Sequence, residues 1–172
     1  MPRVFVTVGT TRFDELIKVM SQESVIQALH DHGYSHLVMQ IGTGEEPEIN
    51  HTSIPAGMKV EFFGKKDSIH DDVQQADLII SHAGSGSLFE SLRMGKKIIA
   101  VPNESLMGNH QTELANALGQ DGNVISARIH NLEQLIVEQG DELFTQRLQQ
   151  LKPMQKANTK AFADVVDDEM MN

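Results

Sequence analysis

The chain has 172 residues, a formal net charge of −10 at pH 7 and no cysteine. Its length supports one domain with a sizeable core but not two of ordinary size. The acidic balance argues against nucleic acid or an anionic membrane as the main partner, because both would repel this surface, and without cysteine no disulfide or thiolate metal site can form.

Short runs rich in β-branched residues alternate with segments of helical periodicity. In chain order we expect a strand at residues 3–8, a helix at 13–32 broken near 20–22, a strand at 36–41, an exposed loop at 43–56, a strand at 58–63, a helix at 68–76, a strand at 77–81, a helix at 87–94, a strand at 97–101, a helix at 110–118, a strand at 123–126 and a helix at 132–151 interrupted near Gly140. This alternation predicts an α/β fold, a single Rossmann-like domain with a mostly parallel sheet.

The turn before the helix at 87–94 contains the sequence His-Ala-Gly-Ser-Gly-Ser, residues 82–87. Ligands of open α/β sheets bind outside the carboxyl ends of the strands. Gly84 and Gly86 allow the backbone to approach a ligand, and Ser85 and Ser87 add hydroxyl groups. The helix N-terminus supplies backbone N–H groups with partial positive charge. The turn is therefore predicted to bind a phosphate or diphosphate.

Glu90 lies one turn into the same helix, where its carboxylate would repel a phosphate but could accept hydrogen bonds from ribose hydroxyls. The dinucleotide fingerprint G-x-G-x-x-G is incomplete because Phe89 occupies its third glycine position, although Glu104 follows Gly84 by twenty residues. A hydride-transfer cofactor is not expected, and nothing in the chain requires a metal ion. Taken alone, His82 is better explained as a buried, satisfied histidine at a strand end than as a ligand-binding residue.

Two further polar turns are predicted at the same sheet edge. Gly9, Thr10 and Thr11 follow the first strand, and Asn109, His110 and Gln111 precede or begin the helix near residue 110. Asn109 is also a natural N-cap, which would leave ligand contacts to His110 and Gln111. Three such turns at one edge are harder to explain by packing than any one of them, so they favour a shared ligand site.

The segments VFVTVGTTRFDELI, GYSHLVMQIGTG and ADLIISHAGSGSLFESLRMGKKIIAVPNESLMGNHQTELANAL resemble the donor-binding catalytic subunits of the eukaryotic UDP-N-acetylglucosamine transferases of dolichol-linked oligosaccharide assembly. More broadly, they are similar to the C-terminal half of two-domain inverting glycosyltransferases of the GT-B fold. The resemblance runs from residue 3 to about residue 118, and the turn that begins at His82 together with Glu90 is its most specific part.

The resemblance implies a role for each matching residue in binding the donor UDP-N-acetylglucosamine. The residues Gly9, Thr10, Thr11, Gly84, Ser85, Gly86 and Ser87 would approach the diphosphate. His82 would neutralise phosphate or hold its turn, and Glu90 would bind the ribose. Asn109, His110 and Gln111 would contact the sugar. The resemblance assigns neither the catalytic base nor the loop that holds the uracil.

The resemblance also implies a division of the chain and a partner. Residues 1–152 would form the nucleotide-sugar-binding domain, and residues 153–172, with a short apolar stripe after Pro153, would dock on a partner. A membrane-anchored partner subunit would bind the lipid-linked acceptor, N-acetylglucosaminyl-diphosphodolichol. The chain itself is expected to be cytoplasmic and recruited to the cytosolic face of the endoplasmic reticulum.

Two alternatives of other kinds stay open from the sequence. One is a subunit of a bacterial split exopolysaccharide glycosyltransferase that uses another UDP-hexose, since Gln111 could serve either sugar. The other is a noncatalytic module that binds nucleotide sugars and transfers nothing.

Overall fold

The computed structural model describes residues 2–104 and 110–154. Its strands are β1 (Arg3–Thr7), β2 (His36–Gln40), β3 (Lys59–Phe63), β4 (Leu78–Ser81), β5 (Lys97–Ala100) and β6 (Ile125–Ser126). Its helices are α1 (Asp14–Met20), α2 (Glu23–Asp31), the 3₁₀ turn η1 (His51–Ser53), α3 (His70–Gln75), α4 (Ser85–Arg93), α5 (His110–Gln120), α6 (Ile129–Val137), α7 (Gly140–Glu142) and the π-helical turn η2 (Leu143–Arg147).

The six strands form one parallel sheet in the order β3-β2-β1-β4-β5-β6. Strands β2 and β3 are added on one side of β1. The chain then crosses back, and β4, β5 and β6 are added on the other side of β1. The change of direction makes the gap between β1 and β4 the topological switch point, where ligands of such sheets bind. The predicted α/β class and the parallel sheet are confirmed.

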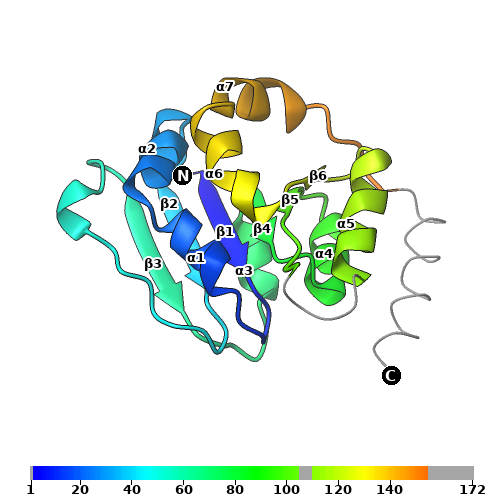
Figure 1. The fold of residues 1–172 in the computed structure, drawn as a ribbon, viewed down its shortest axis with the longest axis horizontal. Coiled ribbons are helices and arrows are strands. Elements are labelled where there is room, and N and C mark those ends of the chain that lie inside the picture. The colour runs from blue at the N-terminus through cyan, green and yellow to red at the C-terminus, as the bar shows by residue number, and fades with distance from the viewer. Residues whose placement is uncertain (1, 105–109, 155–172) are drawn as a thin grey trace.

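Helices cover both faces of the sheet, as Figure 1 shows. On one face, Leu16 of α1, Leu29 of α2 and Leu132 of α6 join a single core cluster with the strands. On the other face, Leu88 of α4 and Leu118 of α5 belong to a second cluster. Coverage on both faces explains why every residue of β2 is buried and why the strands have apolar runs rather than alternation.

Several predicted boundaries move in the structure. The helix α4 begins at Ser85, not at residue 87, because Gly84 adopts the extended conformation of an N-cap and the following serines complete the first turn. The strand predicted at 123–126 is reduced to the two residues of β6. The single helix expected at 132–151 is instead α6, α7 and η2, with the break after Val137 and Gly140 at the start of α7.

The chain before residue 154 remains attached to the domain. The amide of Lys152 donates to the Gly122 carbonyl at 2.8 Å, and the Asn123 side chain donates to the Lys152 carbonyl at 3.2 Å. Met154 packs against the second core cluster. The docking segment was predicted at residues 153–172. Its residues from 155 onward lie outside the described residues. Within the described residues, no helix is both long and apolar enough to span a bilayer.

Candidate functional site: the turns at the β1–β4 switch point

Three strands end on a row of buried polar side chains at the switch point. Thr7, the last residue of β1, pairs in register with Gln40 of β2 and with Ser81 of β4. The Thr7 hydroxyl donates to Gln40 Oε1 at 2.5 Å. All three residues are at most 2 % exposed. Sequence reasoning missed this row, although the polar residue that ends each apolar run was a usable signal.

The first turn, at residues 9–11, is supported by this row. Gly9 has φ +65°, a left-handed conformation that favours glycine, and its amide donates to the Thr7 hydroxyl at 3.0 Å. The Thr11 hydroxyl donates back to the Val8 carbonyl at 2.8 Å. Thr10 and Thr11 are exposed at the tip. The turn therefore presents small and polar groups to solvent beside the carboxyl end of β1.

The second turn joins β4 to α4 and contains a strained residue. Ala83 is buried with φ +67°, a region that alanine rarely adopts, and its amide donates to the Ser81 hydroxyl at 3.2 Å. The first hydrogen bond inside α4 runs from the Leu88 amide to the Gly84 carbonyl at 3.0 Å. The amides of Gly86 and Ser87 precede that bond and point out of the helix N-terminus, as an anion site requires.

His82 lies beneath this second turn rather than on its surface. The side chain is buried, and its Nδ1 lies 3.2 Å from the Thr7 carbonyl oxygen, which can only accept. Nδ1 therefore carries the proton in the neutral ring. Burial lowers the pKa of His82 from 6.5 to about 4, against the opposing effect of its bond to the Thr7 backbone. At neutral pH the ring is uncharged, and its hydrogen bond to the Thr7 carbonyl is compatible with the predicted role of holding the turn.

Glu90 has a partner that the sequence did not reveal. Its carboxylate lies 3.3 Å from Nδ1 of His70, at the start of α3, and both side chains reach solvent. The pair joins the first residue of α3 to the middle of α4. An exposed pair of this kind contributes at most about 1 kcal/mol to stability, so Glu90 remains available to a ligand.

The third predicted turn is described only in part. Asn109 lies outside the described residues. His110 begins α5 with an exposed side chain, and Gln111 Oε1 accepts a 3.4 Å hydrogen bond from the Asn103 amide after β5. Since β1, β4 and β5 are consecutive parallel strands, the turns that follow them share one edge of the sheet. The structure therefore brings together the described site residues that the sequence singled out.

A second ion pair, which sequence reasoning did not predict, joins the segment after β5 to the segment before α6. Arg128, before α6, donates two hydrogen bonds to the Glu104 carboxylate after β5, at 2.8 and 3.1 Å. Those hydrogen bonds lower the pKa of Glu104. Glu104, which stood at the spacing of a ribose-binding acid, is thus engaged by an arginine instead.

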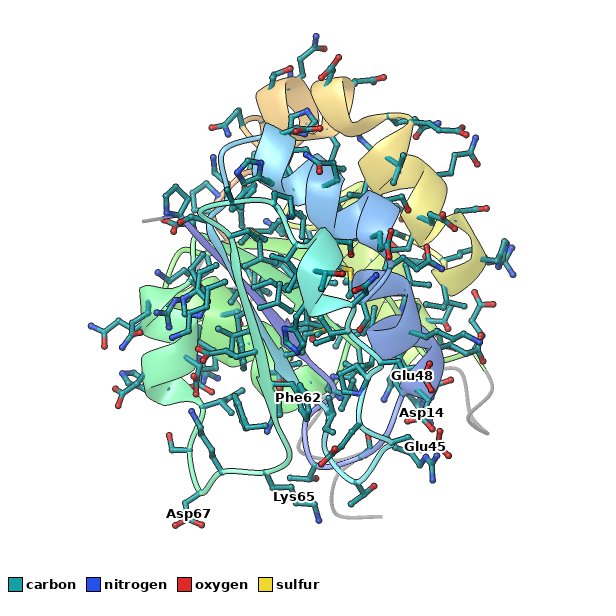
Figure 2. All side chains as sticks on the ribbon, turned by 90° about the vertical axis from the view of Figure 1, so that its left-hand side faces the viewer. Asp14, Glu45, Glu48, Phe62, Lys65 and Asp67 are labelled. Carbon is teal, nitrogen blue, oxygen red and sulfur yellow. The ribbon has the colours of Figure 1, made fainter. Side chains whose placement is uncertain are left out.

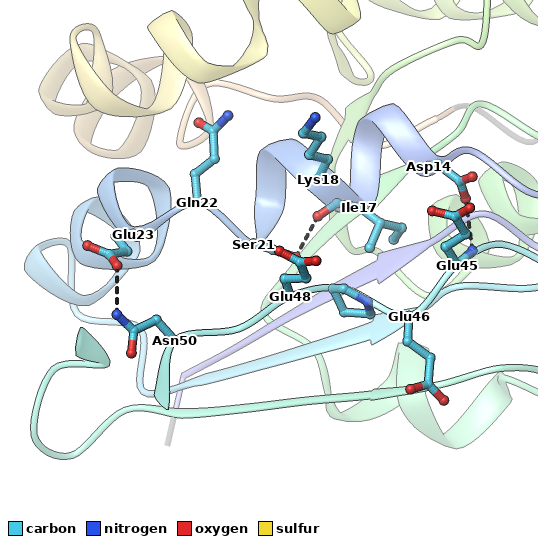
Figure 3. A pocket seen from close by; sticks show the side chains of 11 residues that line it. Asp14, Ile17, Lys18, Ser21, Gln22, Glu23, Glu45, Glu46, Glu48 and Asn50 are labelled. Atoms are coloured by element: carbon cyan, nitrogen blue, oxygen red, sulfur yellow. Dashed lines mark hydrogen bonds between the residues drawn. The ribbon is translucent and has the colours of Figure 1, made fainter. Parts of the chain in front are cut away.

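A pocket of about 450 Å³ lies elsewhere, between α1 and the loop at residues 45–50 (Figure 3). Figure 3 shows Asp14 and Glu45 side by side, with Glu48 further along the pocket, and in Figure 2 Lys65 and Asp67 mark the loop after β3. Its charged lining residues are Asp14, Lys18, Glu23, Glu45, Glu46 and Glu48. Five carboxylates against one lysine give the wrong charge for a diphosphate.

Comparison with known proteins agrees with the fold. The family model described as the glycosyltransferase family 28 C-terminal domain matches residues 3–168. A Mus musculus protein named UDP-N-acetylglucosamine transferase subunit ALG13 is 47% identical over 129 residues, which are 72% of this chain and 10% of that protein. The chain thus spans about a tenth of the mouse relative.

A relative of similar length carries the same name. The Cryptococcus neoformans protein is 31% identical over 195 aligned residues, which cover 97% of this chain and 96% of that protein. An NMR solution structure of ALG13 has a TM-score of 0.66 at 25% identity and covers 96% of this chain and 94% of its own. From the family match and these relatives, the chain belongs to the glycosyltransferase family 28 C-terminal domain family.

Proposed function

We propose that this chain is the donor-binding subunit of a UDP-N-acetylglucosamine-dependent glycosyltransferase. The observation that carries the proposal is the pair of turns at the β1–β4 switch point, one with Gly9 and one with Ala83 in left-handed conformations. Membership of the family and the name shared by the relatives support the choice of sugar nucleotide.

In the proposed complex, backbone amides bind the diphosphate. The amides of Gly86 and Ser87 and the positive end of the α4 dipole would stabilise the negative charge that develops on UDP as the glycosidic bond breaks. The first turn, with Gly9, Thr10 and Thr11, would approach from the β1 side. A neutral His82 beneath the second turn adds no charge, so the amides carry this stabilisation.

The sugar and ribose would lie on either side of the diphosphate. Glu90 would accept from the ribose hydroxyls in place of its contact with His70. Gln111, at the start of α5, can both donate to and accept from hydroxyls of N-acetylglucosamine. Transfer with inversion also needs a base that removes the proton of the acceptor hydroxyl. We assign no residue of this chain to that step.

We further propose that the acceptor is supplied by a partner. The relatives are named as subunits, which supports an enzyme of more than one chain. The proposed partner is membrane-anchored, presents N-acetylglucosaminyl-diphosphodolichol on the cytosolic face of the endoplasmic reticulum and contacts residues 153–172. Ending the chain before Lys156 should then leave UDP binding intact and abolish capture of the partner. A truncated chain that still captures the partner would contradict the docking role.

Calorimetric titration tests the donor. The chain should bind UDP and UDP-N-acetylglucosamine, and UDP-galactose less tightly, and transfer to the lipid-linked acceptor should need membranes that contain the partner. Equal affinity for UDP-galactose, with transfer of galactose, would favour the exopolysaccharide alternative. Donor binding without transfer to any acceptor, with partner membranes present, would favour a noncatalytic module.

A further inference from the structure

The His82 ring occupies the space between the two turns of the site. Its Nδ1 is hydrogen-bonded to the Thr7 carbonyl, and its backbone amide donates to the same oxygen at 3.0 Å. The adjoining edge of the ring, with Cε1 and Nε2, faces both glycine turns. A Cβ built on Gly9 would lie 3.1 Å from Cε1 and 3.3 Å from Nε2. A side chain at position 9 would therefore meet this buried ring.

Gly84 is even closer to this ring. A Cβ built on Gly84 would lie 2.5 Å from Cε1 of His82 and would overlap Nε2. The conformation of Gly84 does not itself require glycine, since its φ of −65° and ψ of 133° are open to any residue. The His82 ring is therefore the reason that the chain needs glycine at position 84.

Gly86, two residues further on, is in the opposite situation. A Cβ built there would meet nothing within 4 Å. Its backbone is helical, where alanine is more favourable than glycine. No contact within the described protein demands a glycine at position 86, whereas position 84 is filled from below by His82. The two glycines of the motif thus differ: the His82 ring excludes a side chain at position 84, and no described neighbour excludes one at position 86.

We infer that His82 is a positioning residue whose ring acts as a spacer between the turns at Gly9 and Gly84 and so sets the separation of the two backbones that receive the donor diphosphate. The inference rests on the proposed function for the identity of that ligand. It adds to that function a steric role for His82 beneath the phosphates. It also explains the glycine at position 84 by the space that the His82 ring needs, rather than by contact with the ligand.

A double-mutant cycle tests the spacer. In the parent, Gly84→Ala should raise the Kd for UDP about tenfold or more, because the new methyl group displaces the ring and with it the turn. His82→Ala should raise the Kd by a smaller factor, since the turns lose their fixed separation. In the His82→Ala background, Gly84→Ala should change the Kd less than about twofold, because the methyl group enters vacated space.

The unfolding midpoint of the same four proteins, measured without ligand, gives an independent reading. Gly84→Ala should lower the midpoint in the parent and leave it unchanged in the His82→Ala background. His82→Asn provides a second background with a shorter side chain if His82→Ala does not fold. The spacer role would be overturned if Gly84→Ala changed the Kd and the unfolding midpoint by the same amount with and without the His82 ring. It would also be overturned if the Gly84→Ala protein were as stable as the parent.

The outcome is separable from that of the proposed function. If the folded parent binds neither UDP nor inorganic pyrophosphate, donor binding fails, and the unfolding midpoints still decide whether His82 and Gly84 are sterically coupled. If the parent binds UDP but Gly84→Ala costs the same with and without the ring, the donor site stands and the spacer is rejected.

Discussion

The switch-point turns and the acidic pocket beside α1 are two very different openings on this protein. The pocket has a volume of about 450 Å³, and five carboxylates line it. The turns instead combine glycine backbones, a helix N-terminus and a buried polar row. For an anionic ligand, the sign of the local charge and the direction of backbone N–H groups matter more than the volume of a cavity.

The largest effect is expected at Gly86. Gly86→Val places a branched side chain in the space where the diphosphate would approach, and the Kd for UDP should rise at least about 100-fold, or 2.7 kcal/mol. Gly86→Ala is the matched control, because alanine favours the helix and should leave the protein at least as stable while weakening UDP binding less. A folded Gly86→Val protein with the parent's affinity for UDP would remove the turns from the donor site.

Glu90 separates ligand binding from surface pairing. Glu90→Ala should weaken UDP binding by about 1.5 to 3 kcal/mol, the cost of losing hydrogen bonds to a charged group, with little change in the melting temperature. His70→Ala removes the same surface pair and should leave UDP affinity close to that of the parent. Calorimetry and thermal unfolding measure the two quantities. Parallel losses of stability and affinity in Glu90→Ala would show that the carboxylate is structural.

The low pKa of His82 predicts that the free energy of unfolding decreases as the pH falls. Its pKa is near 6.5 in the unfolded chain and about 4 in the folded protein, so between these values the unfolded state binds more protons and stability falls as the pH falls. Between pH 7 and pH 5 the parent should lose about 2 kcal/mol more than His82→Asn. Urea unfolding at each pH measures this difference. Identical pH dependence in the two proteins would mean that the ring is not buried and neutral.

The smallest effect is expected in the acidic pocket. Glu46→Gln combined with Glu48→Gln removes two of its exposed carboxylates and should change the Kd for UDP by less than about twofold, because salt screens exposed charges that do not contact the ligand. A tenfold gain in affinity would show that the pocket's field reaches the site, and a tenfold loss would place a donor contact there. Either result would contradict the conclusion that the acidic pocket and the switch-point turns act independently in UDP binding.

Local pattern was sufficient for most of the architecture. The β-branched runs, the alternation with helical periods and the break near residues 20–22 predicted all six strands and the order of the helices. These features depend on neighbours a few residues apart, and burial of one face or stripe is enough to select them. The motif that starts at His82 and the turn at Gly9 were also predicted to share one edge of the sheet, and in the structure they follow the neighbouring strands β4 and β1.

Only the tertiary structure decided what each of those residues contacts. Thr7 and Gln40 are 33 residues apart and His70 and Glu90 are 20 apart in the sequence. The His82 ring, after β4, lies close to Gly9, which follows the neighbouring strand β1. Such contacts depend on which strands are neighbours and in which register, and the sequence pattern does not encode either. The roles of Gly84 and Gly86 illustrate the limit: they look alike in the motif, and they differ because a buried ring lies under one and open space lies beside the other.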